Sequence, residues 1–518
     1  MTRTLTSVAL ALLMITSMVA VPVAAAGGDV GFQQYDRGGA NQPSFIVTYD
    51  NGSLDSLETW AEERSEYDIV EYTNESNEAL VAGPRFQVES PSFWQDPIAA
   101  ASAGTIAPTP LEDRSYIVDV SPNYRHSYAE PLTSLASESA YDAPASDWAV
   151  RGGYSTDGIA FSGDANESTM AEVRTAIDAD EVSADGTGVT VTVLDTGLNV
   201  KNGSDDPLYG TRISAARNFV SDEDAVATND YTNVSDGDGH GSWVAASIAA
   251  NATNDSYDGV APGANLLVGK TLDDDGSGST QDIVEGIRWA EANNADILSM
   301  SLGSPVYDEE IAAALEDYLA GNGTVAYVAV GNSRFTRPVQ IASPADAQHE
   351  GVISVAATNT TDAENASVAY FSQTGEDNGY TDASGGETQG AGPDVAMPGM
   401  SITVPTYSES GYRRNSTLSG TSMATPIEAA RGAVGLDANP SLVNNTETFA
   451  SWVRNTTNPI PNAGSTEVGN GMGSVKRLVN LNASETTQEE ERTDPAKNRD
   501  MANGDYSVFR AIIRSVSA

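Results

Sequence analysis

Cysteine is absent from all 518 residues of this chain. A thiol nucleophile and a disulfide are therefore excluded, and the fold must be held by core packing, hydrogen bonds or bound ions. Because single hydrophobic cores stop growing near about 250–300 residues, the length predicts one large domain with accessory segments. Without disulfides the protein needs a large core.

Lysine is almost absent as well, and positive charge of either kind is scarce. Lysine occurs only at positions 201, 270, 476 and 497, and 26 basic residues stand against 73 acidic ones, for a formal net charge of -47. This excludes nucleic-acid binding, because phosphate backbones need clustered Lys and Arg. The acidic residues are spread along the whole chain, which favours a hydrated surface suited to concentrated salt. An acidic patch for a basic partner or for calcium is the alternative.

Long hydrophobic runs are missing except at the amino terminus. Residues 1–26 carry one arginine as their only charge, an apolar run over 8–23, and three alanines at their end. This pattern is typical of a secretory signal peptide and predicts a secreted, extracellular protein. An uncleaved membrane anchor is the alternative, but two polar residues and a proline interrupt the run. No other segment is apolar enough to span a bilayer, so we expect no membrane span after signal removal.

Four segments follow the signal peptide. Residues 27–125 contain strand and helix patterns that predict a small α+β domain, and 126–187 have the composition of a connecting region with few packing demands. Residues 188–482 alternate short apolar strands with helices, which predicts a doubly wound α/β domain on a buried parallel sheet. Residues 483–518 form a polar tail.

Three residues suited to nucleophilic catalysis lie at turns of the predicted α/β domain. Asp195 ends a strand, at the sheet edge where ligands and catalysts gather. His240, one of three histidines, lies between glycines where a loop becomes a helix. Ser422 begins a later helix, whose backbone N–H groups and partial positive charge lie beside the hydroxyl. Taken singly, each also has a structural interpretation, such as an N-cap serine.

Together the three residues supply a complete catalytic apparatus. A serine hydroxyl is a poor nucleophile until a neutral imidazole accepts its proton, and the imidazole needs a carboxylate to fix its tautomer and stabilise its charged form. Asp195, His240 and Ser422 can take these three roles. Their order along the chain, Asp before His before Ser, is one of the known orders for this triad.

The segments around these residues resemble the active-site motifs of the subtilisin-like serine proteases. They are Val193-Leu-Asp-Thr-Gly197, Gly239-His-Gly-Ser242 and Gly420-Thr-Ser-Met-Ala424, within a match over about 188–480. The resemblance implies a subtilisin-like fold in which Asp195 orients the imidazole, His240 acts as base and then acid, and Ser422 attacks the scissile carbonyl. It also implies an endopeptidase that forms an acyl-enzyme on polypeptide substrates. With the charge pattern, we expect a secreted, monomeric member from a halophilic archaeon.

Two further matches concern substrate and oxyanion. Ala329-Val-Gly-Asn332 resembles the family's oxyanion-hole segment, which implies that the Asn332 amide and the Ser422 backbone N–H donate to the developing oxyanion. A plain turn after a strand is the other interpretation of Asn332. The runs 272–278 and 299–303 resemble the two edges between which an extended substrate adds as a strand. By this resemblance the substrate is lined by Gly276, Ser277, Gly278, Ser301, Leu302 and Gly303.

The resemblance bears on metals and on maturation too. The chemistry requires no metal or cofactor, and structural calcium stays open with its ligands unknown. Asp273 to Asp275 could begin a calcium loop, but the twelfth position from Asp273 is Val284 and not the glutamate of an EF-hand. The element order of the α+β domain is similar to the family's propeptide, a chaperone and inhibitor that is removed. We therefore expect a zymogen that processes itself.

The chain departs from the family pattern beside the triad. Ser242, Trp243 and Ala246 stand where the family usually has Thr, His and Gly, and Ile427 and Glu428 stand where it usually has His and Val. None of these is a triad residue. They change the packing around the triad, so they bear on efficiency.

The sequence is also compatible with two other functions. An aspartic protease could use Leu194-Asp-Thr-Gly197 as its catalytic turn, but a single chain needs two such turns and no second one occurs. A homodimer would meet that requirement and would leave the Ser422 motif unexplained. A binding protein that keeps the fold without activity would have no need of intact triad and oxyanion positions.

Overall fold

The computed structural model describes residues 44–62, 67–73, 77–82, 115–123, 125–128, 132–133 and, with gaps, 168–481. The predicted signal peptide, the polar tail and most of the predicted connecting region lie outside the described residues. Within the described part, no helix is both long enough and apolar enough to cross a membrane.

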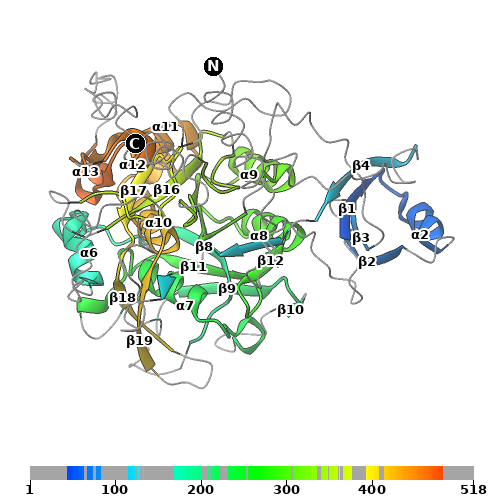
Figure 1. The fold of residues 1–518 in the computed structure, drawn as a ribbon, viewed down its shortest axis with the longest axis horizontal. Coiled ribbons are helices and arrows are strands. Elements are labelled where there is room, and N and C mark those ends of the chain that lie inside the picture. The colour runs from blue at the N-terminus through cyan, green and yellow to red at the C-terminus, as the bar shows by residue number, and fades with distance from the viewer. Residues whose placement is uncertain are drawn as a thin grey trace, which may run out of the picture.

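A small α+β domain lies to one side of the molecule, as the alternating apolar pattern predicted (Figure 1). Its antiparallel sheet has the order β2-β3-β1-β4. Helix α2 buries Leu57 and Trp60 against Phe45 and Val81 of the sheet. Arg288 of the large domain donates to Glu78 on β3 at 3.0 Å. The elements are β1 (Ser44–Tyr49), α2 (Leu54–Glu62), β2 (Asp68–Thr73), β3 (Glu78–Ala82) and β4 (Ile117–Pro122).

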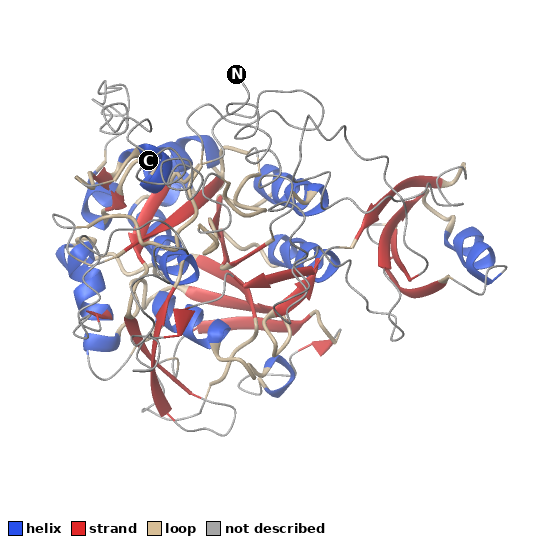
Figure 2. Cartoon of the chain, in the orientation of Figure 1, coloured by secondary structure: helices blue, strands red, loops and turns tan. Residues whose placement is uncertain are grey.

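The large domain is built on one sheet with the order β10-β9-β11-β8-β13-β15-β16-β17-β21-β20. All neighbours from β9 to β21 pair in parallel, and short antiparallel strands close both ends. Its central strands are continuous apolar runs because helices cover both faces (Figure 2). The predicted doubly wound α/β fold is confirmed. The strands are β8 (Thr190–Asp195), β9 (Arg212–Asn218), β10 (Glu223–Asp224), β11 (Asn265–Lys270), β13 (Ile297–Met300), β15 (Val325–Ala329), β16 (Val352–Thr358), β17 (Val395–Pro398), β20 (Thr457–Asn458) and β21 (Met472–Gly473).

Helix α10 (Thr421–Ala438) runs through the core, buried along nearly its whole length. It packs against α7 and against β13, β15, β16 and β17. Small residues allow this close packing: a Cβ on Gly432 would lie 2.3 Å from the Tyr327 hydroxyl. The remaining helices are α6 (Met170–Ala176), α7 (His240–Ala249), α8 (Thr280–Ala292), α9 (Glu309–Ala320), α11 (Thr446–Asn455), α12 (Ser465–Val468) and α13 (Val475–Asn480), with 3-10 turns η2 (Ala179–Glu181), η3 (Thr232–Val234), η4 (Asp255–Tyr257) and η5 (Pro440–Leu442).

Two small sheets join segments that are far apart in the sequence. One has the order β12-β5-β14 and the other β6-β19-β18-β7. Strand β12 directly precedes α8, and β19 ends just before α10 begins. Both small sheets also take strands from the region before residue 170. Their strands are β5 (Arg125–Tyr128), β12 (Ser277–Ser279), β14 (Leu302–Gly303), β6 (Leu132–Thr133), β7 (Ser168–Thr169), β18 (Ile402–Tyr407) and β19 (Arg413–Ser419).

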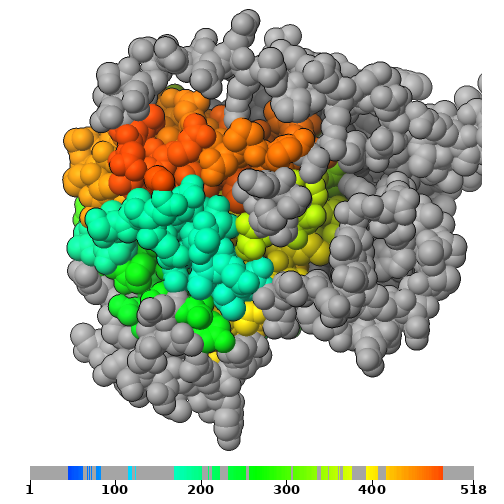
Figure 3. All heavy atoms as spheres, turned by 90° about the vertical axis from the view of Figure 1, so that its left-hand side faces the viewer, coloured from blue at the N-terminus to red at the C-terminus, as the bar shows by residue number. Residues whose placement is uncertain are grey.

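The stretch 126–187 contains regular elements, namely β6, β7, α6 and η2, where a loop-rich connector was expected. A capping box between Thr169 and Glu172 starts α6, which buries Met170 and Val173 in the main core. The backbone N–H of Val475 donates to the Ile177 carbonyl at 2.7 Å, so this stretch lies against the carboxyl-terminal helices (Figure 3). A seven-residue helix is too short to stand out by apolar periodicity, which is why the pattern missed it.

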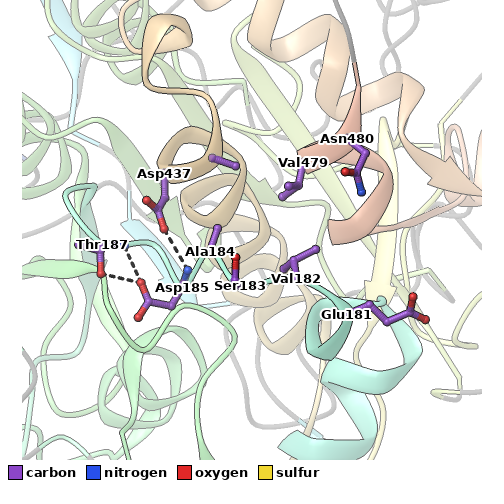
Figure 4. Close-up of a pocket in the computed structure, with 10 residues that line it drawn as sticks. Glu181, Val182, Ser183, Ala184, Asp185, Thr187, Asp437, Val479 and Asn480 are labelled. Carbon is purple, nitrogen blue, oxygen red and sulfur yellow. Dashed lines mark hydrogen bonds between the residues drawn. The ribbon is translucent and has the colours of Figure 1, made fainter.

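A pocket of about 590 Å³ opens where α10 ends, between the segment after η2 and α13 (Figure 4). Asp437 Oδ2 accepts from the backbone N–H groups of Asp185 and Gly186 at 3.0 and 3.1 Å. Apolar Val182 and Val479 line the pocket beside these acids. None of the predicted site residues lines it, so it is separate from the predicted active site.

Candidate active site

Asp195 lies at the carboxyl end of β8, near the middle of the large sheet. Only 1% of its surface is exposed. Its Oδ1 accepts from the backbone N–H of Thr196 at 2.7 Å and lies 2.7 Å from His240 Nδ1. A buried carboxylate therefore contacts the imidazole directly.

His240 is the first residue of α7, and the glycines beside it are required by the backbone. Gly239 has φ 98°, in the left-handed region that favours glycine. A Cβ on Gly241 would lie 2.4 Å from the Gly197 carbonyl oxygen, so any side chain there would separate α7 from the turn after β8. These two glycines allow His240 to approach Asp195.

The electrostatics of His240 favour its charged form overall. Burial lowers the pKa of the imidazole, but the charge and hydrogen bond of Asp195 and the charges of Asp238 and Asp236 together outweigh burial. The pKa of His240 is therefore raised above its ordinary value. Because a general base must be neutral, activity through this group should rise with pH as the imidazole loses its proton.

Ser422 lies in the first turn of α10 and is fully buried. Its hydroxyl donates to the Ser301 carbonyl at 3.2 Å, and the Ser301 hydroxyl donates back to the Ser422 carbonyl at 2.9 Å. Helix α7, which begins at His240, packs against α10. The packing of these two helices brings the three predicted catalytic residues to one region at the carboxyl edge of the sheet.

Asn332 follows β15 and is held beside Ser422 through Thr421. Its Oδ1 accepts from the backbone N–H and the hydroxyl of Thr421, both at 2.9 Å. The carboxamide therefore presents its oxygen, and not its Nδ2, to α10. Gly331 before it has φ 97°, and a Cβ there would lie 2.1 Å from Gln373 Oε1. The backbone conformation and the close packing of this turn therefore require glycine at position 331.

The two predicted substrate edges are β12 and β14, and the chain's own strand β5 lies between them. Ser277 and Gly278 pair antiparallel with Ser127 and His126. On the other side Leu302 and Gly303 pair antiparallel with Tyr128 and Ser127. Residues 125–128 thus form the middle strand of a three-stranded sheet, the arrangement that strand addition predicts for a bound peptide.

The acidic run beside this edge closes a turn. Asp273 Oδ1 accepts from the backbone N–H groups of Asp275 and Ser277 at 3.0 and 2.9 Å, and Gly276 has φ 74°. Among the described residues, no three His, Asp or Glu side chains come together in a group that could hold a metal ion. Asp273 thus shapes the turn beside the substrate edge.

Both bulky departures from the family pattern are accommodated. Trp243 is fully buried, and its indole Nε1 donates to the Ser416 carbonyl on β19 at 3.0 Å. Glu428 and Arg431 form a fully buried ion pair, in which Arg431 Nε donates to Glu428 Oε2 at 2.9 Å. Arg431 also donates to the Val453 carbonyl at 2.8 Å. Trp243 joins α7 to β19, and Arg431 joins α10 to α11.

Removing one partner of this ion pair should strongly destabilise the fold. Arg431→Met leaves the Glu428 carboxylate buried without its cation, and we expect the free energy of unfolding to fall by about 3–5 kcal/mol. Denaturant unfolding in molar salt measures the change. The double variant Glu428→Met with Arg431→Met removes both charges and should lose less. A double variant as unstable as the single one would contradict the electrostatic explanation.

Sequence reasoning missed a set of polar residues behind the triad, chiefly Asp236 and Thr196. The Thr196 hydroxyl donates to Asp236 Oδ1 at 2.8 Å, and both residues are buried. Lys270, one of the few lysines, is also buried there and donates to the Thr196 carbonyl at 2.5 Å. The scarcity of lysine and the position of Asp236 in the glycine-rich loop before His240 were the signals that could have found them.

A parallel sheet whose carboxyl edge brings a buried Asp-His pair to the start of a serine-bearing helix has the architecture of a serine hydrolase. A family model described as the subtilase family matches residues 186–488. The chain belongs to the subtilase family of serine-type endopeptidases.

Two curated relatives support this assignment. Alkaline elastase YaB from Bacillus sp. (strain YaB) is 34% identical over 289 residues, which cover 55% of this chain and 63% of the relative. Subtilisin DY from Bacillus licheniformis is 32% identical over 311 residues, covering 59% of this chain and 95% of the relative. The chain thus spans less than two thirds of the first relative and nearly all of the second.

Among solved structures, fervidolysin from Fervidobacterium pennivorans, described as a keratinolytic enzyme related to subtilisin, is similar in fold. It aligns with a TM-score of 0.59 at 21% identity and covers 87% of this chain and 63% of its own chain. This likeness concerns the fold alone.

Proposed function

We propose that this protein is an exported serine endopeptidase with Asp195, His240 and Ser422 as its catalytic triad. The 2.7 Å contact between His240 Nδ1 and Asp195 Oδ1 carries this proposal. It holds the imidazole in the tautomer with a proton on Nδ1, so that Nε2 is the nitrogen that accepts the proton of Ser422. Membership of the subtilase family supports the same assignment.

In the proposed mechanism, Ser422 Oγ attacks the scissile carbonyl carbon while its proton passes to His240 Nε2. The carbonyl oxygen becomes an oxyanion, to which Asn332 Nδ2 and the Ser422 backbone N–H donate. The imidazolium, stabilised by Asp195, gives its proton to the leaving amine, and water then hydrolyses the acyl-enzyme by the same steps. This scheme requires no metal or cofactor. Any bound calcium would be structural, with ligands that are not identified.

The proposed substrates are extended polypeptides bound between β12 and β14. Strand β5 supports this, because its backbone pairs with both edges at once. A substrate in the same place would be lined by the residues predicted for it, namely Gly276, Ser277, Gly278, Ser301, Leu302 and Gly303.

We also propose that the chain is a zymogen that cuts itself between Tyr128 and Leu132. Tyr128 pairs with Leu302 on the substrate edge, and Leu132 pairs with Ser419, three positions before Ser422. The bonds between these residues are therefore flanked on both sides by segments that adjoin the nucleophile. Residues 27–125 would act as chaperone and inhibitor, with β5 (Arg125–Tyr128), which begins where they end, filling the substrate edges, and 188–482 would form the catalytic domain.

Determining the mature amino terminus tests this proposal. The full chain expressed in molar salt should yield a mature protein that begins between residues 129 and 132, and Ser422→Ala should remain uncut there. Later trimming could move the terminus, so the earliest sample decides. If the mature protein in that sample already begins after residue 133, the proposed cleavage site is wrong. Processing of Ser422→Ala at the wild-type position would contradict self-cleavage, because a foreign protease would then be responsible.

The charge of the chain supports its proposed environment. A formal net charge of -47 from 73 acidic residues repels itself strongly at low ionic strength, and concentrated salt screens that repulsion. With the signal-like residues 1–26, this supports a monomeric enzyme secreted by a halophilic archaeon and active in molar salt. The protein should therefore be assayed in molar salt.

A further inference from the structure

Asp236 lies in the loop before α7, four positions ahead of His240, and only 1% of its surface is exposed. Both of its carboxylate oxygens are used. Oδ1 accepts from the Thr196 hydroxyl at 2.8 Å and from the Gly239 backbone N–H at 2.7 Å. Oδ2 accepts from the backbone N–H and the hydroxyl of Ser242 at 2.8 and 2.6 Å. Asp236 itself does not touch the imidazole in any of these contacts.

These contacts join the two elements that carry the Asp-His pair. Thr196 directly follows Asp195 at the end of β8, whereas Gly239 and Ser242 flank His240 at the start of α7. The Thr196 hydroxyl also accepts from the Gly241 backbone N–H at 2.9 Å. A single carboxylate therefore links the turn after β8 to the first turn of α7.

Asn199 reinforces the same connection from the turn side. Its Nδ2 donates to the Asp236 carbonyl at 2.6 Å, and its Oδ1 accepts from the Asp236 backbone N–H at 3.1 Å. Its own backbone N–H donates to Ser242 Oγ at 2.9 Å. Ser242 Oγ therefore donates to Asp236 and accepts from Asn199, so a hydroxyl at position 242 satisfies both neighbours.

The hydrogen bonds at position 236 require a carboxylate. All the groups that face its two oxygens are donors, and an ionised carboxylate is an acceptor only. An asparagine would turn an NH2 group toward one pair of N–H or O–H donors. Because the position is buried, water cannot relieve the mismatch, and the loop or the helix start must shift.

Several other charged groups surround this network. Asp195 faces His240 from β8, and Asp238 faces it from the same loop as Asp236. From β11, Lys270 donates to the Thr196 carbonyl at 2.5 Å and to Asp274 Oδ1 at 2.7 Å. Asp274 also accepts from the Gly237 backbone N–H at 3.2 Å. The network thus extends from the Asp195 turn to the substrate edge.

We propose that Asp236 is a positioning residue for hydrolysis, which holds His240 in register with Asp195 through its bonds to Thr196 and Ser242. It touches neither substrate nor the reacting atoms. Its negative charge also favours the imidazolium that forms when Ser422 attacks, in line with the raised pKa of His240, for which burial is the opposing effect. This inference rests on the proposed function.

The test compares four variants of the full chain by the pH profile of kcat/KM on a peptide substrate in molar salt. Asp236→Asn should lower kcat roughly 10- to 100-fold with KM little changed, so the plateau of kcat/KM should fall by the same factor. A misplacement of about 1 Å can cost about 10²-fold. The acidic limb of its profile should move to lower pH, because a negative charge that raises the pKa of His240 has been removed.

Asp238→Asn is the matched control, because it removes a nearby charge without breaking the link. Asp238 Oδ1 accepts from the His240 backbone N–H at 3.1 Å, and an amide oxygen can still accept there. Its acidic limb should also move to lower pH, while its plateau should fall far less than that of Asp236→Asn, because the link between β8 and α7 is kept. Ser242→Ala should lower the plateau without moving the limb, and Ser242→Thr, which keeps the hydroxyl, should retain wild-type values.

The outcomes separate this inference from the proposed function. If the wild-type chain does not hydrolyse peptides, the proposed function fails. If the wild type is active and Asp236→Asn keeps its plateau, or Asp238→Asn loses as much, the positioning role is refuted. If Asp236→Asn does not fold, the comparison of Ser242→Ala with Ser242→Thr decides, and equal plateaus in those two variants would overturn the inference.

Discussion

Ser422→Ala is expected to lower kcat for casein hydrolysis by about 10⁶-fold, the size of the loss known when subtilisin itself is deprived of its nucleophile. The physical reason is that no other group can form the acyl-enzyme. Binding between β12 and β14 does not involve the hydroxyl, so KM should change little. The residual rate should come from the oxyanion donors and from substrate binding alone.

Two controls accompany this measurement in molar salt. Ser451→Ala removes a serine on α11, whose hydroxyl accepts from Asn455 at an exposed site, and it should keep wild-type activity. A serine-directed sulfonyl fluoride should inhibit the wild type and should not label Ser422→Ala. If Ser422→Ala digested casein as fast as the wild type, the triad mechanism would be refuted. Inhibition by an aspartyl transition-state analogue would point to the aspartic protease alternative.

Asn332→Leu is expected to lower kcat by about 10²–10³-fold with little change in KM, a magnitude that comes from subtilisin itself. The ground-state carbonyl needs this donor little, but the transition state carries a full oxyanion in a site from which water is excluded. Leucine has a similar volume and no N–H to donate. Steady-state kinetics on a peptide substrate separate kcat from KM.

Thr421→Val is the matched control for this prediction. It removes the hydroxyl that donates to Asn332 Oδ1 and leaves the backbone N–H that donates to the same oxygen. The carboxamide should be held less firmly, and the loss should be smaller than for Asn332→Leu. If Asn332→Leu raised KM while kcat stayed constant, Asn332 would be a ground-state binding group and not an oxyanion donor.

Much of the fold followed from local patterns. The strands Thr190–Asp195, Asn265–Lys270 and Val352–Thr358 are rich in apolar residues and buried along nearly their whole length, as expected for the alternating strands and helices predicted over 188–482. The helix at 280–292 has an apolar face and begins with a capping box from Ser279. Helix α6 and the hairpin β18-β19 were not predicted, because α6 has only about two turns, β18 contains Pro405 and β19 is largely polar.

The amino-acid sequence by itself determined which side chains are available for catalysis and where each lies on its element. Asp195 had to end a strand, and His240 and Ser422 had to begin helices, because apolar runs and glycines set those boundaries locally. The glycines at 239 and 241 were visible in the sequence, but the reasons for them, the left-handed φ of Gly239 and the close approach of Gly197 to Gly241, were not.

Only the tertiary structure decided how these residues are held. Strand β5 enters the substrate edges, the Asp236 carboxylate joins β8 to α7, and Arg431 neutralises Glu428 inside the core. The pairing of β5 and the hydrogen bonds of Asp236 join residues on different elements. The Arg431–Glu428 pair lies within α10 and depends on the burial of that whole helix. A buried charge or an added strand gains its energy from partners that folding brings together, so no local pattern can reveal it.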